Sequence, residues 1–302
     1  MMRLIRPSFE IIEQKPGELG MMKHIETCGR VAWKSEDAIK DDSYIKFIDM
    51  LKGVNHGSVL EHGTVYLKLT NEDHGTITQL IWHKYRKNKY SKATNITPDR
   101  EPWHSLAVYI TTNYRVLVEN DWLEDLQYQC EPTEFHERRF TVRFICDRGV
   151  SHEFVRHRVF SFTQESTRYC NYSKDKFGNE ITYIIPCWFT GITEATTDEL
   201  KEVYGDKDVN RYYSSDNCEN EWVMSMLDNE ATYNSLIENE WKAQQAWAVL
   251  PNSLKTELIM TGFMSDWEHF FKLRTASGAH PQAQELAIPL QEAFTELYGG
   301  KE

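Results

Sequence analysis

The sequence predicts an α/β fold, with a mixed α+β sheet flanked by helices, that is not a Rossmann fold. Stretches with the alternation typical of strands occur between stretches with the spacing of helices. Apolar residues make up 40% of the 302 residues and aromatic residues 13%, which is ample for a large core. The 15 glycines form neither a GxGxxG nor a P-loop motif, so side chains would have to hold any nucleotide.

The first half is expected to alternate strands and helices. These are a strand with a turn at Pro7 over 4–12, helices over 23–32, 43–51 and 106–126, and a β-branched strand over 63–69. Residues 84–103 are polar, basic and interrupted by prolines, which predicts a surface loop or insertion.

The second half has one clear strand, in which Phe140, Val142, Phe144 and Cys146 share a face. The other patterns predict helices over 150–158 and 283–298, a helix over about 219–249 that is either interrupted or complete, and loops over 173–180 and 190–218. Residues 256–262 fit either a strand or a helix. Ser265 and Glu268 have capping-box spacing, which predicts that a helix starts at Ser265.

Net charge, hydropathy and cysteine spacing restrict the class of protein. The net charge of −12 disfavours a nucleic-acid-coating protein, because phosphate neutralisation needs a basic surface. There is neither an apolar run of 18 residues nor an apolar segment of a signal peptide near the start, so no membrane association is expected. The widely spaced cysteines, without a CxxC pair, indicate reduced thiols and a cytoplasmic location.

The most unusual stretch concentrates Arg156, His157, Arg158 and Arg168 within 13 residues of an acidic chain. Guanidinium groups offer a planar fork of donors that can hold phosphate or the carbonyl edge of a planar ring. A solvated basic loop is the alternative interpretation.

Arg274 shares a predicted helix face with Trp267, Phe270 and Phe271. A charge on an aromatic stripe either extends its head to solvent at the helix end or is placed at a ligand. Both interpretations remain open from this pattern alone.

No metal site is expected. The histidine pair His56 and His62, with Glu61, could suggest a metal, but the absence of a further ligand nearby in sequence favours hydrogen-bonded histidines. His152 and His157 are five residues apart, whereas the helical zinc motif needs four, and Arg156 occupies the required position.

Arg156-His157-Arg158 followed seven residues later by Ser166 resembles the RHR-x7-S signature of flavin-dependent thymidylate synthases. Similar blocks follow the family's order at 56–62, 246–251, 267–274 and 283–286, and they cover about half of the chain. The resemblance implies a single domain over 1–302 with insertions at about 70–138 and 174–230.

This family methylates dUMP reductively to dTMP. Methylenetetrahydrofolate supplies the carbon, FAD carries the hydride, and NADPH reduces the flavin. The resemblance therefore implies an enzyme of this kind, a methyltransferase in nucleotide biosynthesis. It also implies a homotetramer whose active sites are shared between subunits.

The resemblance also implies roles for individual residues. Arg274 would be catalytic, stabilising negative charge on the uracil ring. The residues that would contact FAD are Ser58, Arg156, His157, Arg158, Gln164 and His269. The residues that would contact dUMP are Glu153, Arg156, Gln164, Glu165, Ser166, Arg168 and Arg274.

The chain departs from the family at Trp247, where an arginine that contacts dUMP is common, and at Phe263 and Ser265, where flavin-contacting Asn and Arg are expected. No cysteine nucleophile is expected, although Cys170 lies in a matched segment. Two alternatives remain: a nucleotide- or RNA-binding module, and a flavoprotein that acts on another pyrimidine nucleotide.

Overall fold

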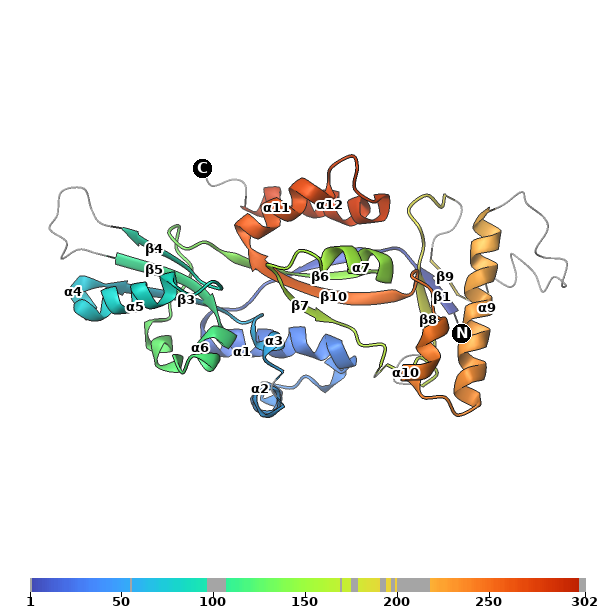
Figure 1. The fold of residues 1–302 in the computed structure, drawn as a ribbon, viewed down its shortest axis with the longest axis horizontal. Helices are drawn as coiled ribbons and strands as arrows, with labels where there is room; N and C mark the ends of the chain where they lie inside the picture. Colours follow the sequence, from blue (N-terminus) through green and yellow to red (C-terminus); the bar gives the residue numbers. More distant parts are fainter. Residues whose placement is uncertain are drawn as a thin grey trace.

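Three small sheets lie along the long axis of the molecule, each covered by helices (Figure 1). The computed structural model describes residues 2–54, 56–96, 107–168, 170–174, 179–190, 194–196, 199 and 218–298. The four-stranded sheet β2-β6-β10-β7 is central, and the sheets β3-β5-β4 and β8-β1-β9 lie at its two ends. The expected mixture of strands and helices is confirmed.

The strands of the described chain are β1 Met2–Ile5, β2 Ser8–Ile12, β3 Thr64–Thr70, β4 Lys92–Ile96, β5 Ala107–Asn113, β6 Arg139–Asp147, β7 Ser161–Gln164, β8 Ile181–Ile184, β9 Ala195–Thr196 and β10 Lys255–Phe263. The α-helices are α1 Gly17–Arg30, α2 Ser43–Gly53, α3 Gly57–Leu60, α4 Asn71–His74, α5 Thr76–Arg86, α6 Tyr114–Glu119, α7 Arg148–Phe154, α9 Cys218–Glu238, α10 Ala243–Ala246, α11 Met264–Arg274 and α12 Pro281–Tyr298. The 3₁₀ turns are η1 Val31–Trp33, η2 Glu36–Ala38, η4 Leu123–Tyr128 and η7 Trp247–Val249.

The two faces of the central sheet differ in chemistry. On one face Phe144, Cys146 and Leu258 are fully buried against α7, α11 and α12. On the other face, toward α1–α3, the strands present polar side chains such as Thr141 and Thr261. The alternation predicted for 140–146 is therefore correct, and both faces are covered.

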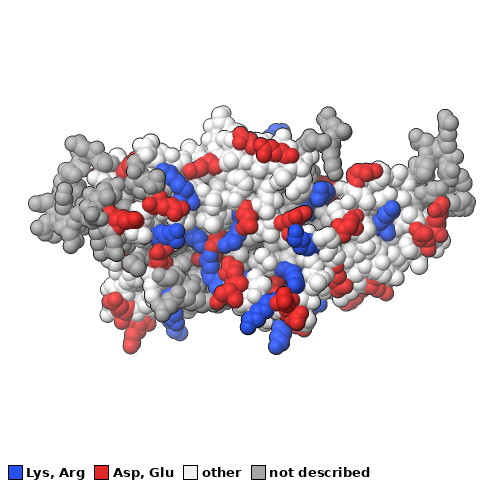
Figure 2. All heavy atoms as spheres, turned by 180° about the vertical axis from the view of Figure 1, so that it is seen from behind, with Lys and Arg blue, Asp and Glu red and all other residues white. Residues whose placement is uncertain are grey.

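Basic and acidic side chains are interspersed over the face of the molecule shown in Figure 2. This matches a chain with 34 Lys and Arg against 46 Asp and Glu. The described residues contain no helix that is both long enough and apolar enough to cross a membrane.

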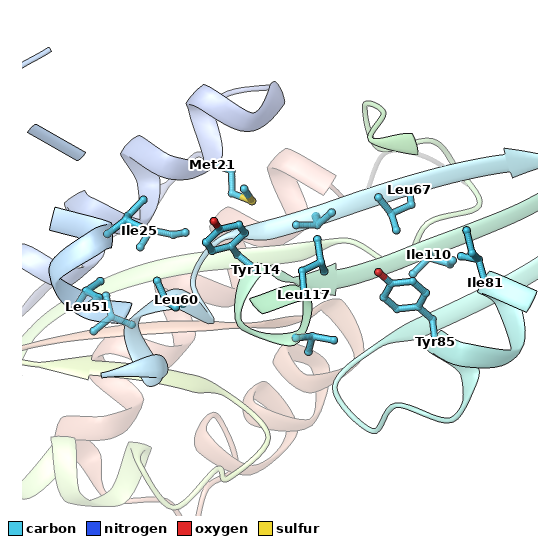
Figure 3. Packing of buried hydrophobic residues seen from close by; sticks show 14 of the residues in the cluster. Met21, Ile25, Leu51, Leu60, Leu67, Ile81, Tyr85, Ile110, Tyr114 and Leu117 are labelled. Carbon is cyan, nitrogen blue, oxygen red and sulfur yellow. The ribbon is translucent and has the colours of Figure 1, made fainter. Parts of the chain in front are cut away.

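One apolar cluster joins α1, α2 and α3 to the sheet β3-β5-β4 (Figure 3). Ile25 of α1 and Leu60 of α3 belong to the same cluster as Leu67 of β3 and Ile110 of β5. The insertion predicted at 70–138 therefore has no core of its own, but shares one with the helices below the central sheet.

The prediction of a helix over 106–126 is wrong. Residues 107–113 form β5, which pairs with both β3 and β4, and a helix starts only at Tyr114. Val108 and the run Ile110-Thr111-Thr112 are β-branched, which favours a strand. Asn113 then begins α6, because its side chain accepts a hydrogen bond from the Val116 amide at 3.1 Å.

The loop predicted over 84–103 is also wrong in part. Its first residues complete α5, and 92–96 form β4, while 97–103 lie outside the described residues. The loop predicted over 190–218 contains the short strand β9, although most of that range is likewise outside the described residues.

Of the two alternatives for 219–249, the interrupted helix is the correct one. Its first helix, α9, ends at Glu238, and Glu240 has a positive φ of 66°, which ends a helix. The ambiguous stretch 256–262 is the strand β10. The helix α11 starts at Met264 rather than Ser265, because Asp266, not Glu268, accepts from the cap amide of Phe263 at 3.0 Å.

A buried hydrogen-bond chain crosses the polar face of the sheet. His24 Nε2 lies 3.0 Å from Thr141 Oγ1, and Thr141 Oγ1 lies 2.7 Å from Thr261 Oγ1. His62 continues the chain, with Nδ1 2.7 Å from Thr261 and Nε2 2.9 Å from Thr163. This confirms hydrogen-bonded histidine as the interpretation of His62.

These two histidines make the stability of the fold depend on pH. Burial, followed by the charge of Arg139, lowers the pKa of His24 to about 4, and burial lowers that of His62 well below its ordinary value. Between pH 6.5 and 4 the unfolded chain binds protons at both positions and the folded chain does not. Stability should therefore fall as the pH drops through this window, by about 1.4 kcal/mol per pH unit for each histidine.

Urea unfolding at pH 7 and pH 5 tests this. The variant His24→Gln should lose less stability between the two pH values than the wild type, by one histidine's contribution. His83→Gln, at an exposed position on α5, is the control and should keep the wild-type difference. An unaltered pH dependence in His24→Gln would contradict the prediction.

Candidate functional site

Arg274 lies at the end of α11 and is fixed by residues of α7 and the turn that follows it. Its Nε donates to His157 Nε2 at 2.9 Å and its Nη2 donates to the main-chain oxygen of Glu153 at 2.7 Å. Its Nη1 forms an ion pair with the Glu153 carboxylate. Because a guanidinium has five N–H donors, the two donors not used in these contacts remain for a ligand.

Packing determines where Arg274 lies. Trp267, Phe270 and Phe271 of α11 are buried in the apolar cluster above the sheet, which fixes the rotation of the helix. On the other side, the Val150 amide of α7 donates to the Asp147 carboxylate at 2.8 Å, which fixes the start of that helix. Asp147 is thus a structural determinant that the sequence indicated only as a turn.

His157 is uncharged at neutral pH. Burial, and then the charges of Arg274 and His269, lower its pKa to about 4. The His269 ring lies 6.3 Å away between centroids. Since His157 Nε2 accepts from Arg274, its proton must be on Nδ1. The arrangement therefore places a neutral acceptor and a carboxylate around one cation.

The other two residues of the RHR segment face solvent. The helix α7 ends at Phe154, earlier than the 158 predicted, so Arg156 and Arg158 lie in the turn before β7. Both side chains are exposed. Exposed guanidinium groups beside the Arg274 group can bind an anionic ligand without first breaking a buried ion pair.

The segment after β7 holds the next group of predicted residues. Gln164 donates to Ser151 Oγ at 3.0 Å and to Thr256 Oγ1 at 3.2 Å, which ties it to α7 and β10. The amide of Ser166 donates to Ala32 O at 3.1 Å, while the Arg168 side chain is exposed.

Glu165 is oriented differently from the ligand contact that the resemblance implies. Its side chain is only 2% exposed. Its carboxylate accepts from Lys255 at 2.9 Å and from the hydroxyl of Tyr172 at 3.3 Å. It therefore faces an internal ion cluster rather than an open surface.

Ser58 lies apart from the Arg274 group. It is exposed on α3, which packs below the central sheet, whereas α7 and α11 lie above it (Figure 1). Nearby, Glu61 pairs with Arg115 through a 2.6 Å contact, and the His56 ring stacks on Trp33 with the centroids 6.1 Å apart. Across the described residues no group of three or more His, Cys, Asp and Glu side chains could hold a metal ion.

The positions that depart from the family pattern have local structural roles. Phe263 is buried at the start of α11, with Lys92 Nζ 5.4 Å and Arg139 Cζ 5.5 Å from its ring centroid. Ser265 Oγ donates to Glu137 at 2.5 Å. Trp247 lies in η7 and is 38% exposed, so an aromatic surface stands where the family commonly has a cation.

The cysteines of the matched segments are buried. Burial raises the pKa of Cys170 to about 12 and also raises the pKa of Cys28 and of Cys146. Each is therefore a neutral thiol at physiological pH, which disfavours attack by a thiolate.

Sequence reasoning missed a set of ionic residues next to Glu165. They are Lys34, Arg143, Lys255 and Glu257, which come from the residue after η1, from β6 and from β10, and meet below the sheet. A signal was available only in part: Lys255 and Glu257 are two residues apart in a strand and therefore share a face.

The family model described as thymidylate synthase complementing protein matches residues 118–298, which is more than half of the chain. Curated relatives include the flavin-dependent thymidylate synthases of Corynebacterium diphtheriae and Pyrococcus furiosus. The first is 26% identical over 157 residues, 49% of this chain and 54% of the relative. The second is 28% identical over 147 residues, 49% of this chain and 50% of the relative. The chain thus spans about half the length of the curated relatives it matches.

Among solved structures, the chain is similar to the UMP/dUMP methylase PolB from Streptomyces cacaoi bound with 5-Br UMP. The TM-score is 0.43 at 14% sequence identity, over 98% of this chain and 92% of that one.

The charge of Arg274 should be measurable at His157. Replacing Arg274 with Met removes a neighbouring cation that opposes protonation, so the pKa of His157 should rise from about 4 toward 6.5. NMR titration of the histidine ring carbons measures this shift. Lys272→Met, an exposed position on the same helix, is the matched control and should leave the His157 titration in place. An unshifted His157 in the Arg274 variant would contradict the geometry.

Proposed function

Because the chain belongs to the thymidylate synthase complementing protein family, we propose that it is a flavin-dependent thymidylate synthase that converts dUMP to dTMP. In this proposal methylenetetrahydrofolate donates the carbon, and NADPH supplies the hydride through FAD. The observation that carries the proposal is the fixed guanidinium of Arg274, held by Glu153 and His157 of the segment that contains the RHR signature.

The donor set fits FAD. Arg156 and Arg158 present exposed side chains suited to a dinucleotide's phosphates, and His269 presents an exposed imidazole near the ring of His157. We assign these residues, with His157, Gln164 and Ser58, to the flavin. When bound, the flavin would accept a hydride from NADPH and make it available for the reductive step.

The segment from Gln164 to Arg168 is the proposed nucleotide-binding segment. Arg168 is suited to the phosphate of dUMP because its guanidinium is exposed, and Ser166 adds a hydroxyl beside it. Glu153 and Arg156 complete the set from the α7 side. The carboxylate of Glu165 accepts from Lys255 inside the protein, so in this proposal only the main chain of Glu165 borders the nucleotide.

Arg274 is the proposed catalytic residue. Methylation at C5 of uracil requires negative charge to develop on the ring, and the free N–H donors of a fixed guanidinium stabilise such charge. By comparison with the loss of one oxyanion-hole donor, this is worth about 3–4 kcal/mol. Glu153 and His157 hold the guanidinium in place before substrate arrives, which reduces the reorganisation needed during reaction.

The burial of the cysteines supports a mechanism without a protein nucleophile. Cys170 is fully buried and its pKa is about 12, so little thiolate would exist to attack the ring. Charge stabilisation by Arg274 is therefore the route that the described residues favour for activating the pyrimidine.

We further propose a homotetramer in which two subunits form each active site. The positions of Ser58 below the central sheet and Arg274 above it support this, because one ligand would need both faces. We treat residues 1–302 as one domain with insertions at about 70–138 and 174–230. The apolar cluster shared by α1–α3 and the sheet β3-β5-β4 supports this organisation.

One observation favours a second candidate, a flavoprotein acting on another pyrimidine nucleotide. The exposed Trp247 replaces a cation that commonly contacts dUMP in the family. Competition between dUMP and other pyrimidine monophosphates for the protein separates the two candidates. A nucleic-acid-binding module is disfavoured by the interspersed charges of Figure 2.

Replacing Arg274 with Ala should abolish most turnover. Because charge on the ring would lose its stabilising cation, tritium release from dUMP labelled at C5 should fall about 100- to 1,000-fold in kcat. FAD should still bind, since Arg156 and Arg158 are unchanged. Lys272→Ala is the control and should release tritium at the wild-type rate. Wild-type tritium release in the Arg274 variant would show that the assigned role is wrong.

A further inference from the structure

Five charged residues meet below the central sheet, and we call them the ionic cluster: Lys34, Arg143, Glu165, Lys255 and Glu257. Lys255 Nζ lies 2.9 Å from Glu165 Oε2 and 2.6 Å from Glu257 Oε1. Lys34 Nζ contacts Glu257 and lies 3.9 Å from Glu165 Oε2. Arg143 Nε donates to Glu257 Oε2 at 2.8 Å. The cluster thus joins the end of η1, β6 and β10 to the proposed nucleotide-binding segment.

The carboxylates of the ionic cluster are almost completely shielded from water. Glu165 is 2% exposed and Glu257 3%. Buried carboxylates persist only when cations and hydrogen bonds replace their hydration. Removal of either lysine would leave these carboxylates under-compensated. Lys255 restrains Glu165 directly at 2.9 Å. Lys34 acts on Glu165 across 3.9 Å and through Glu257, whose main-chain oxygen accepts from the Glu165 amide.

Restraint of Glu165 is restraint of the nucleotide-binding segment. The Glu165 amide donates to Glu257 O at 2.9 Å, and the next amide, of Ser166, donates to Ala32 O at 3.1 Å. Gln164 is held on the opposite side by Ser151 and Thr256. The side chains of Gln164 and Glu165 are therefore held on opposite faces of the sheet, directly before Ser166 and Arg168.

We propose that Lys34 and Lys255 are positioning residues for nucleotide binding: through Glu165 they hold the segment that presents Ser166 and Arg168. This inference rests on the proposed function for the identity of the nucleotide, dUMP. Neither lysine needs to touch the nucleotide, and their effect is on its binding rather than on the chemistry at the ring.

Lys34 provides a pH signature for this role. Lys34 follows η1 and has a left-handed backbone conformation, with φ 47°. This conformation ends η1 after a single turn. Burial lowers the pKa of Lys34 to about 8. The negative charges of Glu165 and Glu36 raise this pKa, and the positive charge of Lys255 lowers it further. Glu257 and Arg143 face the amine from the sheet. Above pH 8 the amine loses its charge, and the restraint on Glu165 weakens.

The experiment compares Lys34→Met and Lys34→Arg in the full-length protein reconstituted with FAD. In Lys34→Met, the KM for dUMP should rise about tenfold, the effect of one lost charge-assisted hydrogen bond, with kcat nearly unchanged. Lys34→Arg should restore the KM. The wild-type KM should rise between pH 8 and pH 9.5, whereas that of Lys34→Arg should stay level because arginine keeps its charge.

Hydrogen exchange gives a measurement independent of catalysis. The amides of Glu165 and Ser166 should exchange faster in Lys34→Met than in the wild type, because their restraint is released. This readout does not require that the protein be a thymidylate synthase.

Lys84→Met is the matched control. Lys84 pairs with the buried Asp125 in the insertion, with 24% and 3% exposure, against 22% and 3% for Lys34 and Glu257. It should lower thermal stability to a similar extent, but leave the KM for dUMP and the exchange of Glu165 and Ser166 unchanged. The same effects in both variants would reduce the cluster to a general stabilising role and overturn the proposal.

The outcomes separate the two levels of inference. An unchanged KM and unchanged exchange in Lys34→Met would overturn the positioning role while leaving the proposed function intact. If the wild type does not turn over dUMP, but Glu165 and Ser166 still exchange faster in Lys34→Met, the proposed function fails and the restraint of the segment stands.

Discussion

The antiparallel pairing of β6 with β10 runs for nine residues, from Asp147 opposite Lys255 to Arg139 opposite Phe263. Both faces of this pair are covered, one by an apolar cluster and the other by polar and charged side chains. The pairing carries the elements of the proposed site. It leads into α7 and α11 at its ends, which bring Glu153 and Arg274 together, and it supplies Lys255 and Glu257 below.

The two faces of the sheet contribute to the proposed site in different ways. Above the sheet, aromatic packing fixes α11 so that Arg274 meets a carboxylate and a neutral imidazole before any ligand binds. Below it, paired charges take the place of apolar packing and hold Glu165. Apolar contacts set the orientation of whole helices, whereas ionic contacts fix the position of single residues. The loss of one partner in a buried ion pair is strongly destabilising, because the other charge is left uncompensated. A site that spans both faces also accounts for the use of neighbouring subunits in our proposal.

Local periodicity made the strand at 140–146 and the aromatic face of 267–274 predictable, because each pattern lies within one element. It failed at 106–126, where β-branched residues and pairing with β3 and β4 outweighed the apparent helical pattern. Arg274 and His157 were each singled out by a local pattern, but they are 117 residues apart in sequence, so only the family resemblance could assign both to one site. The ionic cluster had no such guide: Lys34 and Glu257 are 223 residues apart, and charges in a sequence indicate a solvated surface unless the fold buries them.

The visible absorption spectrum of the purified protein incubated with FAD, before and after NADPH is added without oxygen, tests the central claim most directly. Our account predicts a retained flavin band that bleaches with NADPH and returns when dUMP and methylenetetrahydrofolate are added, with formation of dTMP. A protein that retains no flavin would contradict it, and would mean that Phe263, Ser265 and Trp247 have removed the capacity of this site for the cofactor.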